Sequence, residues 1–328
     1  MADSFLGKPD PSGITRLSPP VLVRYLVLGM AIATLFLMAL GSATRVMNAG
    51  LACPDWPLCY GEIVPRQQMN LQVFLEWFHR LVASGLGLLV VLLTSLTWYY
   101  RRTLPTWLPW AASFALGLVI LQGLLGGLTV TKLLRFDIVT AHLGTGLLVF
   151  STLLAMGMVL IPYQGTGVVG KLPWVSLAAA LFVYLQSLLG GLVASRWALH
   201  QCLSASQLCR VMNSHVIGVL PATLATLVLI FLAWRTPALH PTLRRLVNLA
   251  GSLLVLQILL GITTFRLHLQ VALITVAHQA VGAGLLGTLV AFSVLALRDR
   301  VGVGHFSVIQ QNLPHQESDL EGPQAAVP

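Results

Sequence analysis

Eight long apolar runs dominate the chain, and short polar or proline-containing segments separate them. Each run holds about 20 or more residues, the length that an α-helix needs to cross the hydrocarbon core of a bilayer. The runs cover residues 24–44, 73–99, 107–130, 138–161, 172–195, 211–234, 244–266 and 271–297. This pattern predicts an all-α integral membrane protein with eight transmembrane helices and with polar tails over residues 1–23 and 298–328.

Composition agrees with a membrane protein. The 328 residues are 56% hydrophobic and only 9% charged, whereas soluble domains carry about 25% charged residues. A formal net charge of +9 would fit a nucleic-acid partner if the basic residues ran together, but they are scattered at the ends of the apolar runs. We therefore expect membrane lipid around the chain and no nucleic-acid partner.

The distribution of Lys and Arg predicts the orientation. Eight spans place both termini on one side, which carries eleven of the 19 Lys and Arg residues, against eight on the other side. Because cytoplasmic loops are enriched in these residues, we expect cytoplasmic termini in a cell (inner) membrane.

Two close cysteine pairs, Cys53/Cys59 and Cys202/Cys209, then fall in outer loops, where disulfides persist. We favour disulfides over a metal site, because CxxC spacing is absent and zinc would need four ligands. Whether the first pair is a structural or a redox-active disulfide stays open.

Four histidines occupy matched positions. The spacing from His79 to His142 is 63 residues, as is the spacing from His215 to His278, and the second pair follows the first at an offset of 136. All four lie about four to eight residues below the outer end of a span, so they share one leaflet. A duplicated unit with two imidazoles predicts two haem sites, since imidazole is a common ligand of haem iron. The alternative is interhelical hydrogen bonding.

Further repeats support the duplication. A Leu-Gln-x-Leu-Leu-Gly motif recurs at 121–126, 185–190 and 256–261, each time in the span before a histidine-bearing span. We expect two four-helix bundles related by a pseudo-twofold axis, with a cofactor site in each. Their predicted bounds are 24–161 and 172–297, joined by a cytoplasmic linker over 162–171. Small residues that follow each histidine would allow close approach of a flat porphyrin, although ordinary helix packing explains them equally well.

Glu76 distinguishes the two halves. It lies three residues before His79 and therefore on the same helix face, while Val139, Met212 and Thr275 stand at the corresponding positions before the other three histidines. This predicts a reactive site in the first half and an auxiliary haem in the second. The alternative is an interfacial carboxylate that the helix dipole stabilises.

Three arginines near the outer ends of the spans, Arg45, Arg80 and Arg196, suit haem propionates, because a guanidinium pairs well with a carboxylate. They suit the role of interfacial anchors equally well.

The stretches Gly41-Ser42-Ala43-Thr44-Arg45, Cys53-Pro54-Asp55-Trp56-Pro57-Leu58-Cys59 and Glu76-Trp77-Phe78-His79-Arg80 resemble the haem A synthase family over about residues 24–297. The resemblance implies oxidation of a methyl group of haem O to the formyl group of haem A. It implies that His79 and His142 hold haem O, that His215 and His278 hold a b-type haem as electron relay, and that Glu76 is the essential carboxylate. Disulfides in the outer loops match a bacterial subgroup of this family.

This resemblance also implies partners: haem O and haem A themselves, haem O synthase, terminal oxidase assembly factors, and further copies of the chain. The main alternative is a dihaem electron-transfer protein, and a second is a haem carrier without chemistry on haem. A prenyltransferase is disfavoured, because no span contains an Asp-rich cluster for metal and diphosphate.

Overall fold

The computed structural model describes residues 19–196 and 207–311. Its elements are all α-helices, with no β-strand among the described residues, and this confirms the all-α prediction. The helices are α1 (Pro19–Val46), α2 (Leu71–Tyr99), α3 (Leu108–Thr131), α4 (Phe136–Leu160), α5 (Leu172–Arg196), α7 (Gln207–Arg235), α8 (Pro241–Arg266) and α9 (Ala272–Gln311). Within these ranges eight helices are long and apolar enough to cross a membrane. The protein is therefore a multi-pass membrane protein.

The last helix differs most from its expected span. It continues to Gln311, so the tail expected from residue 298 begins as helix. The composition of this stretch is polar, but it contains no proline before Pro314. Without a proline ring no backbone hydrogen bond is removed, so the helix can continue beyond the apolar run.

Helix contacts form two closed rings. In the first, α1, α2, α3 and α4 each contact the next helix, and α4 contacts α1. The same order holds for α5, α7, α8 and α9. Between the rings, α4 contacts α9, α1 contacts α9 and α5 contacts α4. If α1 is exchanged with α5 and α4 with α9, the same set of contacts results. A pseudo-twofold axis would produce this pattern, and the axis itself remains a prediction.

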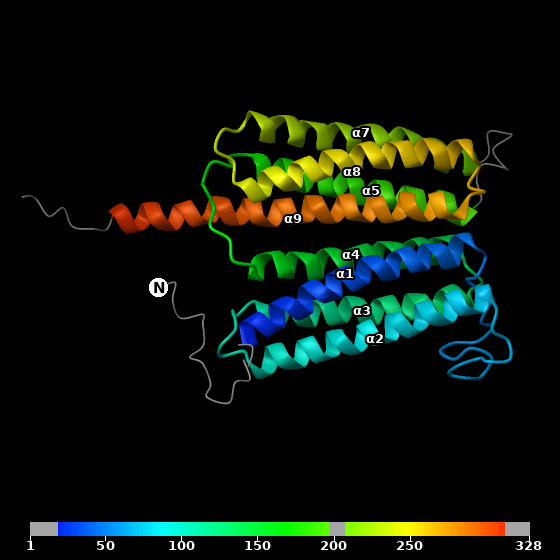
Figure 1. Ribbon diagram of the computed structural model, residues 1–328. Coiled ribbons are helices and arrows are strands. Elements are labelled where there is room, and N and C mark those ends of the chain that lie inside the picture. Colours follow the sequence, from blue (N-terminus) through cyan, green and yellow to red (C-terminus); the bar gives the residue numbers. More distant parts are fainter. Residues whose placement is uncertain (1–18, 197–206, 312–328) are drawn as a thin grey trace, which may run out of the picture.

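Fully buried apolar side chains concentrate toward one end of each bundle. In the first bundle they come from the beginning of α1 and α3 and from the end of α2 and α4, and in the second from the corresponding parts of α5, α8 and α7, together with α9. This is the end at which α1 begins and α9 ends (Figure 1). We call it the termini end, and the opposite end, which carries the loop 47–70, the loop end.

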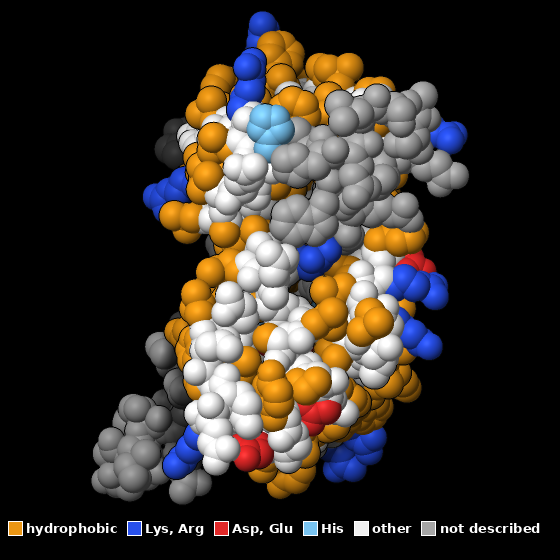
Figure 2. Space-filling model, turned by 90° about the vertical axis from the view of Figure 1, so that its right-hand side faces the viewer, with side chains coloured by type: hydrophobic (Ala, Val, Ile, Leu, Met, Phe, Trp, Pro, Cys, Tyr) orange, Lys and Arg blue, Asp and Glu red, His pale blue; other side chains and the backbone are white. Residues whose placement is uncertain are grey.

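Figure 2 views the loop end. Hydrophobic side chains line the flanks of this face, and its few acidic side chains lie in the middle and lower part, over the first bundle. A lipid-facing flank and a polar loop surface are what a helix bundle that spans a bilayer requires.

Candidate haem sites

All four histidines lie toward the loop end, away from the packed core. His79 and His215 come eight residues after the first residue of their helices, and His142 and His278 come six residues after it. At 1.5 Å per residue this is about 9–12 Å along the helix. Their side chains are half-buried. The four histidines therefore share one depth, as expected.

Each pair of histidines comes from helices at opposite corners of a ring. His79 on α2 and His142 on α4 belong to the first ring, and His215 on α7 and His278 on α9 belong to the second. Two imidazoles in one bundle interior can serve as axial ligands of one haem.

A glycine of the preceding helix faces each histidine ring. A Cβ atom added to any of these glycines would lie closer to the histidine ring than ordinary van der Waals contact allows. Measured from the added Cβ, the distance would be 2.9 Å at Gly41 to Nε2 of His79 and 3.3 Å at Gly126 to Cε1 of His142. It would be 3.0 Å at Gly190 to Cε1 of His215 and at Gly261 to Cε1 of His278. Each ring therefore occupies space that any larger residue would take.

Three of the four rings also lie against a glutamine. The amide nitrogens of Gln122, Gln186 and Gln257 lie 3.4 Å from Nε2 of His142, 2.9 Å from Nδ1 of His215 and 3.5 Å from Nε2 of His278. Each glutamine precedes the facing glycine by four residues, one helical turn. The equivalent residue before Gly41 is Leu37, which packs on the apolar core of the first bundle. Within the described residues, His79 therefore has no glutamine neighbour of the kind that the other three have.

These residues fit a haem better than a bare metal ion. Among the described residues, no group of three or more His, Cys, Asp or Glu side chains could hold a metal ion. Haem iron needs only two protein ligands, because the porphyrin supplies the rest. Nδ1 of His142 and Nδ1 of His278 are buried and find no hydrogen-bond partner in the described part of the chain. Buried imidazole nitrogens of this kind suit an additional ligand.

Three of the glycines that follow the histidines lie against the glutamines. Cβ atoms on Gly146, Gly218 and Gly282 would meet Gln122, Gln186 and Gln257, respectively. These glycines make room for glutamine side chains, which favours ordinary helix packing, and close approach of a porphyrin stays a prediction.

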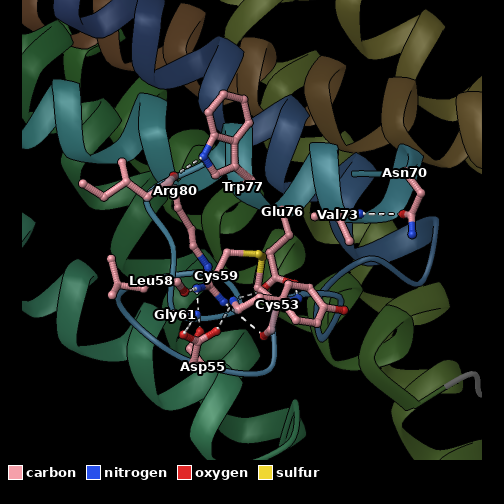
Figure 3. Close-up of a disulfide and its surroundings, with 12 residues drawn as sticks. Cys53, Asp55, Leu58, Cys59, Gly61, Asn70, Val73, Glu76, Trp77 and Arg80 are labelled. Atoms are coloured by element: carbon pink, nitrogen blue, oxygen red, sulfur yellow. Dashed lines mark hydrogen bonds and ion pairs between the residues drawn. A yellow bond between two sulfur atoms is a disulfide. The ribbon is translucent and has the colours of Figure 1, made fainter. Parts of the chain in front are cut away.

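Glu76 is almost fully buried, with 4% of its surface exposed. Its Oε2 accepts a hydrogen bond from the Cys53 amide at 2.8 Å, and its Oε1 pairs with the Arg80 guanidinium at 2.5 Å. Figure 3 shows both contacts beneath α2. Glu76 therefore anchors the loop between α1 and α2 to the helix that carries His79.

Arg80 holds the same loop. Besides Glu76, it donates hydrogen bonds to the carbonyl oxygens of Asp55 at 2.6 Å and Leu58 at 2.5 Å. The Arg80 guanidinium therefore binds the loop in this structure. Its expected contact with a haem propionate stays a prediction.

The disulfide Cys53–Cys59 closes the loop, as expected. Inside it, Asp55 accepts hydrogen bonds from the amides of Tyr60 at 2.6 Å and Gly61 at 2.7 Å. The Gly61 hydrogen bond, followed by that from Tyr60, lowers the pKa of the Asp55 carboxyl.

The second cysteine pair differs from its expected position in one respect. Cys209 lies in the first turn of α7, which begins at Gln207, and not in a loop as predicted. The apolar run begins only at residue 211, but Gln207, Leu208 and Arg210 are good helix formers, so the helix starts one turn earlier. Cys209 is disulfide-bonded, and its expected partner Cys202 lies outside the described residues. The pairing Cys202–Cys209 therefore stays a prediction.

Trp56 extends the first disulfide loop to α3. A Cβ atom on Gly127 would lie 3.2 Å from the Trp56 ring, and Gly127 is next to the glycine that faces His142. The disulfide loop therefore contacts α2, which carries His79, and α3, which carries the glycine that faces His142.

The other two arginines lie elsewhere. Arg45, at the end of α1, lines a small cavity of about 20 Å³ together with Ala194, Leu269 and Thr275, which come from the second bundle. Arg196 ends α5, and its side chain is outside the described residues. Propionate contacts of both arginines stay predictions.

The glutamines and the facing glycines are the site residues that sequence reasoning missed. The Leu-Gln-x-Leu-Leu-Gly repeat, which indicates the duplication, contains both residues at the three sites that have a glutamine. The signal was available: a polar residue repeated inside three apolar spans requires a partner.

The chain is similar to known proteins over most of its length. Residues 24–290 match the model of the COX15-CtaA family, described as cytochrome oxidase assembly protein. The heme A synthase of Shewanella oneidensis is 30% identical over 313 residues, which cover 79% of this chain and 92% of that protein. The heme A synthase of Caulobacter vibrioides is 28% identical over 337 residues, covering 85% and 96%. The chain therefore belongs to the COX15-CtaA family of cytochrome oxidase assembly proteins.

Proposed function

We propose that this chain is a haem A synthase, an oxidoreductase that converts a methyl group of haem O into the formyl group of haem A. The observation that carries the proposal is the pair of histidine sites, each built from opposite helices of one ring and each lined by facing glycines. The named relatives support the same activity.

In this proposal the two bundles have different tasks. His79 and His142 hold the substrate haem O, and His215 and His278 hold a resident b-type haem. Two features of the described residues separate the sites. Only the first site has a neighbouring carboxylate and an anchored loop, and only His79 has no glutamine beside its ring. A b-type haem supplies one-electron transfer when bound.

Oxidation of a methyl group to a formyl group removes four electrons, through two successive hydroxylations and loss of one water molecule. Protons must therefore move at the first bundle: four leave it per methyl group when water supplies the oxygen, and four enter it when O2 does. Glu76 is the proposed proton-handling residue, because it is the carboxylate on the His79 face of α2. Since it also anchors the loop, experiments must separate the two roles.

The primary test is extraction and chromatography of haems from cells that make haem O but no haem A, with and without this protein. We expect haem A only in cells that express it. A protein that binds two haems but yields no haem A would instead be a dihaem electron-transfer protein. Release of unmodified haem to an acceptor would identify a carrier.

Glu76→Gln tests the carboxylate. The amide oxygen can still accept the hydrogen bond from Cys53, but the charge opposite Arg80 is lost, so we expect both haems to be retained and haem A formation to fall at least about 100-fold. Arg80→Gln is the matched control for anchoring, because it removes the same ion pair and leaves the carboxylate.

If the two variants retain both haems and lose haem A formation equally, Glu76 acts only through the loop. Normal haem A production by Glu76→Gln would remove it from the mechanism, and loss of bound haem would make its role structural.

A further inference from the structure

A groove at the termini end lies outside the haem sites. Its volume is about 770 Å³, and it is open to the surroundings. The lining residues come from the linker between the two bundles, from the beginning of α5 and from α9: Gly167, Gly170, Lys171, Trp174, Val175, Ala178 and Arg300. None of these residues contributes to the histidine sites.

One wall of the groove is held in place by Asp299. This buried carboxylate accepts hydrogen bonds from the hydroxyl of Tyr163 at 3.0 Å and from the amides of Thr166 at 3.0 Å and Gly167 at 2.5 Å. A Cβ atom on Gly165 would lie 2.6 Å from the Asp299 Cα, so only glycine allows the linker to approach α9 this closely. The linker is therefore fixed on α9, and the groove is a built feature.

The charges around the groove have one sign. Lys171 and Arg300 are both exposed and line it, and no acidic residue does within the described part of the chain. Asp299 is adjacent in sequence, but its carboxylate is fully buried and already accepts three hydrogen bonds. The two cations are therefore available for an anion.

The position of the groove matches a membrane interface. Arg300 is the last residue of the final span, and Lys171 immediately precedes the first residue of the α5 span. Trp174 is exposed, and tryptophan is enriched at the level of lipid headgroups. Val175 and Ala178 follow it along α5 and offer an apolar surface toward the bilayer interior.

We propose that this groove binds an anionic phospholipid, with the phosphate between Lys171 and Arg300 and an acyl chain along Val175 and Ala178. Basic pockets between transmembrane helices recognise anionic headgroups in this way. The lipid would contact the linker and α9 together. It would thus bridge the two bundles at the point where the chain passes from one to the other.

The test uses the purified full-length protein in a neutral detergent and native mass spectrometry with added phosphatidylglycerol or phosphatidylcholine. We expect the wild type to retain phosphatidylglycerol preferentially. Lys171→Ala with Arg300→Ala should weaken that binding about 10- to 30-fold. The matched control is Arg101→Ala with Arg102→Ala, which removes two exposed charges between α2 and α3 and should change binding less than about twofold.

A charge-conserving pair, Lys171→Arg with Arg300→Lys, should bind phosphatidylglycerol like the wild type. If the double alanine variant does not fold, the single variants Lys171→Ala and Arg300→Ala replace it, and each should show part of the loss of binding. Equal retention of both lipids by the wild type, or equal loss in the control pair, would overturn the proposal. Displacement of phosphatidylglycerol by an equal concentration of inorganic phosphate would show that the groove takes a free anion instead. Because haem binding is not involved, these results are independent of the proposed function.

Discussion

At the scale of single residues, the four histidines differ in the side chain one turn before the facing glycine. Gln186 contacts both Nδ1 and the carbonyl oxygen of His215, at 2.9 and 2.8 Å, whereas Leu37 at the equivalent place offers His79 no polar group. Polar groups that contact a ligating histidine fix the orientation of its ring. We infer that His79 is the least restrained of the four imidazoles.

Gln186→Leu tests this role, because it gives the His215 site the residue that the chain itself places near His79. Loss of the hydrogen bonds should weaken haem binding in the second bundle about 10-fold. The measurement is haem titration followed by the absorption spectrum of the b-type haem. Gln122→Leu is the control and should affect only the first bundle; an unchanged affinity in Gln186→Leu would show that the glutamine only fills space.

Gly190→Ala tests the space in front of His215. The added Cβ would lie 3.0 Å from Cε1 of the ring and displace it, so we expect loss of the b-type haem signal from the purified protein. Gly85→Ala is the matched control, because nothing lies within 4 Å of a Cβ atom there. It should keep normal spectra, and helix propensity predicts a gain in stability of up to about 1 kcal/mol. Full haem content in Gly190→Ala would contradict the assignment of the site.

The sequence alone makes the histidines and Glu76 candidate site residues, because ionisable residues inside apolar spans are rare and stand out. It could not identify the partners of Glu76. Those partners, the Cys53 amide and Arg80, depend on how the loop 47–70 folds back over α2, and hydrophobic periodicity carries no information on loop conformation.

At the scale of helices and loops, the eight spans were predictable because bilayer thickness fixes their length and composition. The end of α9 and the start of α7 at Gln207 were not predictable, because a polar composition does not prevent a helix from extending beyond its apolar run. The contacts of the linker were also hidden, since Tyr163 and Asp299 lie 136 residues apart in sequence.

The linker gives a prediction about alkaline stability. Burial first, and then the hydrogen bond to Asp299, raises the pKa of the Tyr163 phenol well above its usual value of 10.0. The neutral phenol is therefore favoured in the folded protein, and its contribution to stability is complete below about pH 10 and is lost as the pH rises toward the raised pKa. Tyr163→Phe should be less stable than the wild type at neutral pH.

The same variant should lose stability less steeply above about pH 10, and thermal unfolding across the alkaline range would measure both effects. Tyr60→Phe is the control, because Tyr60 is exposed and its phenol is remote from the linker. Parallel pH curves for the wild type and Tyr163→Phe would show that Tyr163 does not contribute.

At the scale of the whole molecule, the differences between the termini end and the loop end predict which end faces the cytoplasm. The termini end carries the packed cores and the groove, and the loop end carries the disulfide loop and the histidines. Eleven of the 19 basic residues fall on the termini side, so we propose that this side faces the cytoplasm. The oxidised Cys53–Cys59 pair agrees, because disulfides persist outside the cytoplasm.

Paired cysteine substitutions test this orientation. Arg66→Cys places a thiol in the loop between α1 and α2, and Arg102→Cys places one between α2 and α3 at the termini end; both arginines are exposed. A membrane-impermeant maleimide added to intact cells should label position 66 and not position 102, whereas both should react after permeabilisation. The two variants serve as controls for each other, because they lose the same charge. The reverse pattern would place the histidine sites next to the cytoplasm and would overturn the proposed orientation.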